Sequence, residues 1–373
     1  MIIGVPKEVK NLEFRVGIVP AGVQALVDAG HKVFIETNAG AGSSMPDSEY
    51  KKAGAQILQK AADVWKKADM VVKVKEPYGD EPSYFRPNLT LFTYLHLAPI
   101  PDLTNELLSK KVTGIAYETV TDKNGGLPLL APMSEVAGRM SVQVGAHCLE
   151  KEQGGKGILL GGVPGVAAAK VVILGGGVSG TNAARVAMGM EAYVTVLDRS
   201  LPRLYELDLQ FGSQLHTLFS TVETIEQEVA AADLVIGAVL VPGAAAPKLI
   251  SRELVRQMKP GSVIVDMAAS ALGGNCELSK ARETVVTENL VTILAPDNLP
   301  ATMPIGSSAF YARNLSALLL QLVKDGALNL DPADEIAGPV TITHGGEIRS
   351  EAVKKLLNPA PAPAAATPAG GAS

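Results

Sequence analysis

A glycine-rich turn after an apolar run is the first feature of this sequence that could bind a cofactor. The run Val171–Leu174 leads directly into six residues with G-x-G-x-x-G spacing, and a helical segment follows. The first glycine permits a tight turn, the second lets the backbone approach a pyrophosphate, and the third lets helix and strand pack closely. The helix N-terminus adds free N–H groups for the phosphates. The pattern predicts a dinucleotide site at Gly175, Gly177, Val178, Ser179 and Gly180; the alternative is a glycine-rich turn without a ligand.

An acidic residue ends the next apolar run. Asp198 closes the segment AYVTVLD, at the position where an acidic side chain binds the ribose 2′-hydroxyl. A carboxylate there repels the 2′-phosphate of NADP, so NAD is the expected cofactor. Arg199, the next residue, weakens that preference.

Four side chains in the first third of the chain could bind or protonate a small molecule: Arg15, Lys73, Lys75 and His96. The two lysines alternate with valines, which places both on one face of a strand and favours a strand end that faces a cleft. His96 ends the run LFTYLH, and ligands of open α/β sheets bind at the carboxyl ends of strands. Each also has an ordinary structural interpretation: an arginine is more often solvated, and a single histidine is more often packed.

Alternating strands and helices must position these residues, and such alternation is typical of a mostly parallel sheet. The sequence predicts an α/β fold of two doubly wound parallel-sheet, Rossmann-like domains with a cleft between them. The expected domains are a substrate domain (1–130 with about 305–357), a dinucleotide-binding domain (131–304) and a disordered Pro/Ala-rich tail (358–373). The expected strands are 1–6, 31–37, 69–75, 89–95, 112–119, 169–174, 192–198, 234–238, 263–266 and 291–295, and the expected helices are 20–29, 47–60, 101–109, 134–151 and 307–324.

Composition narrows the class of protein. The 373 residues suffice for roughly two domains. With 38 acidic and 33 basic residues the net charge is -5, which argues against nucleic acid as the main partner. Two cysteines are too few for a disulfide scaffold and favour the cytoplasm. The charged N-terminus does not resemble a signal peptide, and the apolar runs are too short to insert into a membrane. No histidines or cysteines have metal-ligand spacing, so no metal is expected.

Several motifs together resemble the alanine dehydrogenases. They are GVPKEVKNLEFRV, VKVKEP, LFTYLHLA, AYETV, LPLLAPMSEVAGRM, GGKGILLGGVPGV and VIGAVLVPGAAAPKL, and they cover residues 1–268 densely. The resemblance implies NAD-dependent oxidative deamination of L-alanine to pyruvate and ammonia, a reversible hydride transfer, by a homo-oligomer. It implies that Arg15 and Lys75 bind the substrate and that His96, with Lys75, is catalytic. The NAD site it implies comprises Ser134, the glycine turn, Asp198, Arg203, Ser220, Val239, Leu240, Met267, Asn298 and Leu299.

The resemblance changes after Asp266. Alanine dehydrogenases have an aspartate in a segment before a glycine pair, and Ser270 stands at that position here. A serine supplies no negative charge at neutral pH. Residues 269–350, with GGNCELS and SSAFYARNLSALL, look more like the NAD(H)-binding alpha subunit of proton-translocating transhydrogenase, which works with membrane subunits. Three hypotheses therefore stand: an alanine dehydrogenase, a transhydrogenase subunit, and a non-catalytic NAD-binding protein.

Overall fold

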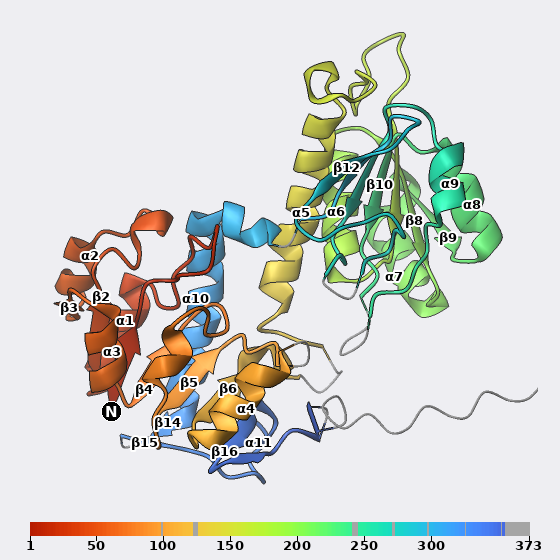
Figure 1. The fold of residues 1–373 in the computed structure, drawn as a ribbon. Coiled ribbons are helices and arrows are strands. Elements are labelled where there is room, and N and C mark those ends of the chain that lie inside the picture. Colours follow the sequence, from red (N-terminus) through yellow and green to blue (C-terminus); the bar gives the residue numbers. More distant parts are fainter. Residues whose placement is uncertain are drawn as a thin grey trace, which may run out of the picture.

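The computed structural model has two sheets in separate lobes, with the long helix α5 running beside the second (Figure 1). Both sheets are mostly parallel and are covered by helices, so the predicted α/β fold of two Rossmann-like units is confirmed. The structure describes residues 1–97, 100–121, 126–240, 245–270, 273–296, 298–324, 326–351 and 353–354. The predicted disordered tail lies outside these residues.

The first sheet has eight strands in the order β17-β16-β6-β5-β4-β1-β2-β3. Its six N-terminal strands are parallel, whereas β16 is antiparallel to β6 and β17 is antiparallel to β16. One edge of this sheet therefore comes from the C-terminal part of the chain. The strands are β1 (Ile2–Val5), β2 (Lys32–Glu36), β3 (Gln56–Leu58), β4 (Met70–Val72), β5 (Thr90–Thr93), β6 (Thr113–Ala116), β16 (Thr341–His344) and β17 (Glu347–Ile348).

The second sheet has the order β12-β13-β11-β10-β7-β8-β9 and is parallel except for β12. The chain builds outward from β7 in one direction through β8 and β9, and in the other through β10 and β11. In open α/β sheets, ligands bind where the strand order reverses, which is here between the carboxyl ends of β7 and β10. The strands are β7 (Lys170–Leu174), β8 (Tyr193–Asp198), β9 (Leu215–Phe219), β10 (Leu234–Gly237), β11 (Val263–Asp266), β12 (Thr284–Val286) and β13 (Thr292–Leu294).

Helices cover the faces of both sheets. The α-helices are α1 (Pro20–Asp28), α2 (Asp47–Lys52), α3 (Ala61–Lys67), α4 (Pro101–Ser109), α5 (Ala131–Cys148), α6 (Val178–Gly189), α7 (Leu201–Phe211), α8 (Val222–Ala231), α9 (Arg252–Gln257), α10 (Pro304–Leu322) and α11 (Ala337–Val340). Single 3₁₀ turns are η1 (Ala41–Ser43), η2 (Glu81–Tyr84), η3 (Tyr117–Thr119), η4 (Lys151–Gln153), η5 (Gly212–Gln214) and η6 (Leu299–Thr302), and a small hairpin joins β14 (Val323–Lys324) to β15 (Ala327–Leu328).

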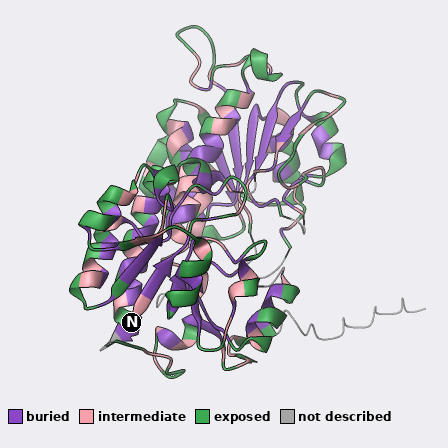
Figure 2. Cartoon of the chain, turned by 60° about the vertical axis from the view of Figure 1, so that its left-hand side comes forward, coloured by how far each residue is buried: buried purple, intermediate pink, exposed green. Residues whose placement is uncertain are grey.

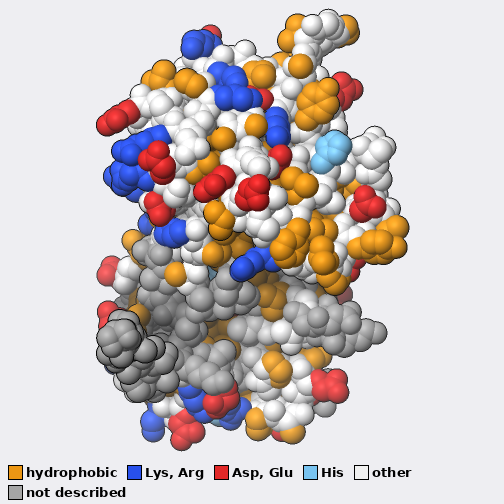
Figure 3. Space-filling model, turned by 90° about the vertical axis from the view of Figure 1, so that its right-hand side faces the viewer, with side chains coloured by type: hydrophobic (Ala, Val, Ile, Leu, Met, Phe, Trp, Pro, Cys, Tyr) orange, Lys and Arg blue, Asp and Glu red, His pale blue; other side chains and the backbone are white. Residues whose placement is uncertain are grey.

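The apolar core lies on both faces of each sheet, and the strands are buried in both lobes (Figure 2). In β7, Val171 and Ile173 pack into one cluster, whereas Val172 and Leu174 pack into another on the opposite face. This explains why the sequence there is apolar without alternation, as is usual for strands covered on both sides. On the face drawn in Figure 3, acidic and basic side chains are mixed and neither sign covers the surface.

Three predicted helices differ from the structure, of which the last, expected over 307–324, spans Pro304–Leu322. The helix expected over 47–60 ends at Lys52, and Gln56–Leu58 is a strand instead. Gly54 separates the two with φ +93°, a left-handed conformation that ends a helix and that residues with a Cβ avoid. The long helix begins at Ala131 rather than at Ser134, because Pro132 occupies its first turn, where a proline needs no hydrogen-bond partner.

Candidate functional site

The glycine turn has the geometry that its sequence predicts. Gly175 has φ +100°, and a Cβ at Gly180 would collide with the Gly175 carbonyl oxygen. At Gly177, by contrast, an added Cβ would meet no atom within 4 Å. The turn is therefore tight at its first glycine, closely packed at its third, and open at the second, where a ligand could approach the start of α6 at Val178.

Asp198 forms hydrogen bonds with the same turn. One of its carboxylate oxygens accepts the N–H of Gly176 at 2.7 Å and the other accepts the N–H of Ser200 at 2.8 Å. Its backbone carbonyl accepts the N–H of Ser220 at 3.0 Å. Arg203 also forms a hydrogen bond with the turn, since its Nε donates to the Gly176 carbonyl at 2.7 Å. The acid, the serine and the arginine predicted for the cofactor site thus lie together behind the turn.

A hollow of about 190 Å³ lies beside the turn. Four predicted cofactor residues line it, together with Met133, Ala137, Ala238 and Ala268: they are Ser134, Ser179, Leu240 and Met267. The Ser179 hydroxyl donates to the Ser134 carbonyl at 3.0 Å, which joins α6 to α5. Val239 is fixed by Asn275, whose side-chain oxygen accepts the Val239 N–H at 3.0 Å and whose amide donates to the Val239 carbonyl at 2.9 Å.

The predicted cofactor residues of this lobe share one edge of the second sheet. The glycine turn follows β7, Asp198 ends β8, Ser220 follows β9, Val239 follows β10, Met267 follows β11 and Asn298 follows β13. Leu299, next to Asn298, is buried at the start of η6. These strands are parallel, so their carboxyl ends lie on the same edge. The structure therefore places the predicted set along one edge of the sheet.

Arg15 follows β1 in the first sheet and is only 3% exposed. Its Nε and one terminal nitrogen donate to the two carboxylate oxygens of Glu13, at 2.7 and 2.6 Å. Burial raises the pKa of Glu13, but the bonds from Arg15 lower it more, so the carboxylate is charged at neutral pH. The other terminal nitrogen of Arg15 donates to the Met133 sulfur at 3.1 Å. The interpretation of Arg15 as a solvated surface residue is wrong.

Asn298 joins the two lobes at this point. Its side-chain oxygen accepts a bond from Arg15 at 3.2 Å, and its amide donates to Glu13 at 2.8 Å. The residue follows β13 of the second sheet, whereas Glu13 and Arg15 follow β1 of the first. The sequence analysis did not single out Glu13; an acid two positions before a functional arginine is the signal that could have found it.

Lys75 and His96 follow the neighbouring strands β4 and β5. Burial lowers the pKa of Lys75, and the charge of Arg15 acts in the same direction. Burial also lowers the pKa of His96 to about 4, with the charge of Lys75 as the next cause. The imidazole is therefore neutral at pH 7 and stacks on the ring of Tyr94, with 5.8 Å between centroids. The three basic side chains predicted for the substrate site, Arg15, Lys75 and His96, are close enough for the charges of Arg15 and Lys75 to lower the pKa of His96.

Lys73 does not lie at a cleft, as its strand pattern predicts. It is 1% exposed and forms ion pairs with Glu8 at 3.1 Å and Glu81 at 2.7 Å. The side chain therefore does not face a cleft, where it could bind a ligand, because two carboxylates of the protein enclose it. Ion pairs of this kind satisfy a buried charge that the fold could not otherwise tolerate.

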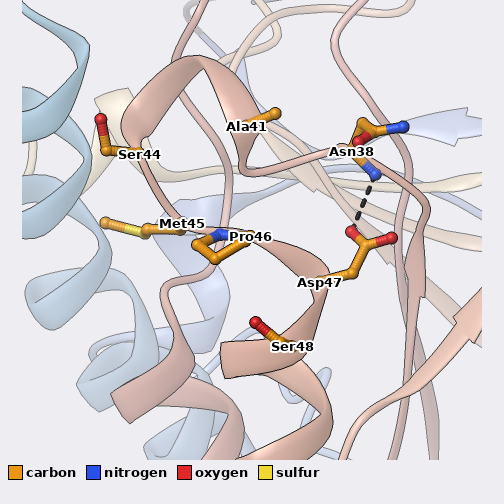
Figure 4. A pocket seen from close by; sticks show the side chains of 7 residues that line it. All are labelled: Asn38, Ala41, Ser44, Met45, Pro46, Asp47 and Ser48. Carbon is orange, nitrogen blue, oxygen red and sulfur yellow. Dashed lines mark hydrogen bonds between the residues drawn. The ribbon is translucent and has the colours of Figure 1, made fainter.

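A second hollow, of about 420 Å³, lies in the turn between β2 and α2 (Figure 4). It is lined by Asn38, Ala41, Ser44, Met45, Pro46, Asp47 and Ser48, none of which was predicted to be functional. The Asp47 carboxylate already accepts bonds from the Thr37 hydroxyl and the Asn38 N–H, at 2.7 and 2.8 Å. This hollow is a property of the local turn.

The described residues also hold no candidate metal centre and no helix that could span a membrane. No group of three or more His, Cys, Asp or Glu side chains there could bind a metal ion. Within the same residues, no helix combines the length and the apolar character that crossing a bilayer requires.

Comparison with known proteins identifies the family. Residues 4–137 match the family described as Alanine dehydrogenase/PNT, N-terminal domain, and residues 141–351 match Alanine dehydrogenase/PNT, C-terminal domain. The chain belongs to the alanine dehydrogenase/PNT family. It is 59% identical to an alanine dehydrogenase of Methanococcus maripaludis over 277 residues, which are 74% of each chain.

Two solved structures separate the branches of this family. An L-alanine dehydrogenase superposes with a TM-score of 0.90 at 46% identity, over 96% of this chain and 99% of its own. A transhydrogenase of Sinorhizobium meliloti superposes with a TM-score of 0.83 at 28% identity, over 93% of this chain and 100% of its own. The chain is thus more similar to the dehydrogenase over nearly its whole length.

Proposed function

We propose that this chain is an NAD-dependent alanine dehydrogenase, which converts L-alanine and water to pyruvate and ammonia and also catalyses the reverse reaction. The observation that supports this most strongly is the contact of Asn298 with Arg15 and Glu13. It joins the edge of the second sheet, with its dinucleotide-type turn, to the cationic edge of the first. A substrate at Arg15, Lys75 and His96 would therefore lie beside a cofactor bound at the turn.

NAD would supply the acceptor for the hydrogen that leaves the α-carbon of alanine as hydride. The residues present fit such a group, since Gly177 leaves open space and the hollow beside it is lined by the predicted cofactor residues. Asp198 would bind the adenosine ribose, and Ser134, Ser179, Leu240 and Met267 would contact the remainder. Arg203 and Ser220 would support the turn and Asp198.

Arg15 and Lys75 would bind the substrate carboxylate and carbonyl. Glu13 occupies two of the three guanidinium nitrogens, so the nitrogen beside Met133 is the one with N–H groups to offer. A sulfur is a weak acceptor that a carboxylate readily displaces. The Lys75 ammonium makes no hydrogen bond or ion pair within the described part of the chain and would complete the clamp.

His96 would move the protons. Its imidazole is neutral at pH 7, so it can accept a proton from the water that attacks the imine carbon and return it to the leaving amine. Lys75 would stabilise the negative charge that develops on the carbonyl oxygen. The chemistry thus needs both residues in one position relative to the substrate.

We extend the proposal to the organisation of the chain. Residues 1–130 with about 305–357 form the substrate domain and residues 131–304 the NAD-binding domain. The enzyme acts in the cytoplasm as a homo-oligomer on a small-molecule substrate.

A second candidate, the NAD(H)-binding alpha subunit of a transhydrogenase, is favoured by one position. Ser270 replaces the aspartate that the dehydrogenases have, and its N–H donates to the Gly273 carbonyl at 2.7 Å. The two candidates differ in one experiment: NADH formation by the purified chain with L-alanine and NAD. Turnover supports the dehydrogenase; NADH binding without turnover supports the subunit, whose membrane partners would then be sought.

A further inference from the structure

Glu118 lies beside the proposed acid/base residue, and no motif role was assigned to it. It belongs to η3, two residues beyond the end of β6, and His96 lies three residues beyond the end of β5. These strands are parallel neighbours in which Thr93 pairs with Ala116. Glu118 and His96 therefore leave the same edge of the sheet side by side.

One oxygen of Glu118 accepts two backbone N–H groups. Its Oε1 accepts the N–H of Leu95 at 3.0 Å and the N–H of His96 at 2.9 Å. The preceding residue, Tyr94, still donates its N–H to Val74 at 3.3 Å, as the chain leaves the sheet. Leu95 and His96 come next, and a buried N–H without an acceptor is costly. Glu118 is thus the acceptor that allows this turn to form.

The turn has an uncommon backbone conformation. His96 has φ +46°, in the left-handed region that residues with a Cβ rarely adopt. Such a conformation persists only where surrounding contacts determine it. Two contacts do so here: the N–H bond to Glu118, and the stacking of the imidazole on Tyr94, whose hydroxyl donates to the Leu129 carbonyl at 2.8 Å.

The second carboxylate oxygen of Glu118 has an unfavourable environment. Oε2 is buried and has no hydrogen-bond partner in the described part of the chain. Burial raises the pKa of Glu118 to about 7, although the two N–H bonds lower it. A carboxyl that served packing alone would be replaced by an apolar side chain at little cost, so its use here indicates a need for the acceptor oxygen.

We propose that Glu118 is a positioning residue for His96: its Oε1 holds the N–H groups of residues 95 and 96 in the turn that aims the imidazole at the substrate. The inference rests on the proposed function. Glu118 acts through the backbone of its neighbour, so it touches neither substrate nor cofactor. What matters is the reach and the acceptor capacity of its oxygen, and its charge is not required.

Two conservative variants of the full chain separate reach from charge. Glu118→Gln keeps the length and an acceptor oxygen but removes the charge, whereas Glu118→Asp keeps the charge but shortens the side chain by one methylene. We expect E118Q to retain kcat for alanine oxidation within about threefold. E118D should lose at least about tenfold in kcat, because small displacements of a catalytic group have large effects. The dissociation constant for NADH should be unchanged in both.

Glu36 provides a matched control, because its carboxylate also accepts a backbone N–H, that of Lys7 at 2.7 Å, at the end of β2 in the same sheet. Glu36→Asp should leave kcat within about twofold of the parent. Equal losses in E118Q and E118D, a loss confined to E118Q, or parental kcat in both would overturn the proposal. Failure of the proposed function is distinguishable, since the parent chain itself would then form no NADH from alanine.

Discussion

The carboxyl edges of the two sheets hold their functional groups in different ways. At the second sheet, the proposed cofactor site depends mainly on the backbone: an open glycine, helix N–H groups and a turn that Asp198 and Arg203 hold by hydrogen bonds. At the first sheet, the proposed substrate site consists of side chains: Arg15 depends on the neighbouring Glu13 and on Asn298 of the other lobe, and the turn at His96 depends on Glu118. A site made of backbone atoms is encoded by one short, contiguous stretch of sequence. A site made of side chains forms only when loops that are far apart in the sequence come together in the folded chain.

The largest effects are expected where the first edge meets the substrate. His96→Ala and Lys75→Ala should each lower kcat/KM for alanine by about 10²–10⁴-fold, the usual range for loss of a positioned acid/base. NADH binding should be spared, because both residues lie on the other sheet from the turn. Initial rates and a fluorescence titration with NADH measure the two quantities. Full activity in either variant would remove this site assignment.

The second edge can be tested with a single methyl group. Gly177 and Gly189 both lie in open space, at the start and at the end of α6. Gly177→Ala should weaken NADH binding by at least about tenfold, because the methyl group occupies the space where the pyrophosphate approaches. Gly189→Ala, the matched control, should not change the dissociation constant. Equal NADH affinity in G177A and the parent would show that the turn does not bind the dinucleotide.

Asp198 tests whether the second edge also selects the cofactor. Asp198→Ala removes the carboxylate that would bind the ribose and repel a 2′-phosphate. We expect NAD affinity to fall by about tenfold and the preference for NAD over NADP to become smaller. Loss of the bond to Gly176 should contribute to the weaker binding. Dissociation constants for both cofactors measure the effect, and an unchanged ratio contradicts the predicted role.

The smallest effect concerns stability at the first edge. The pKa of Glu118 is about 7 in the folded chain, against 4.5 for an unperturbed carboxyl, so the folded chain binds this proton more tightly. The protonated Glu118 therefore contributes to the free energy of unfolding below about pH 4.5, and this contribution is lost as the pH rises to about 7. Glutamine does not titrate, so E118Q should gain up to about 3 kcal/mol of unfolding free energy relative to the parent between pH 4.5 and pH 8.

Denaturant unfolding at several pH values measures this difference. Glu49→Gln, at an exposed position on α2, is the control for the loss of a carboxylate. A difference between E118Q and the parent that does not change with pH would contradict the raised pKa.

The same contrast, between a contiguous backbone site and side chains from separate loops, explains which features the sequence could predict. The glycine turn and the strand ends around it were predictable because strand, turn and helix are contiguous and each glycine has a local reason. Lys73 shows the limit: it shares a strand pattern with Lys75, but its environment depends on Glu8 and Glu81, which reach it from other loops. Glu118 was missed for the same reason, since its importance lies in the N–H bonds that it accepts from the loop after another strand.

Secondary structure shows the same limit. The turn at Gly54 interrupts a stretch whose composition suits a helix, and the strand after it exists because β2 pairs with it. The motif resemblance supplied the roles of Arg15, Lys75 and His96, which neither spacing nor composition could assign.

The most direct test of the account is the initial rate of NADH formation by the full chain with L-alanine and NAD, measured beside a titration with NADH. We predict both tight NADH binding and alanine-dependent turnover that is lost in His96→Ala. Tight NADH binding without turnover would contradict the proposal that a substrate site on the first sheet acts beside a cofactor site on the second. Ser270 would then be the position at which the chain departs from a dehydrogenase.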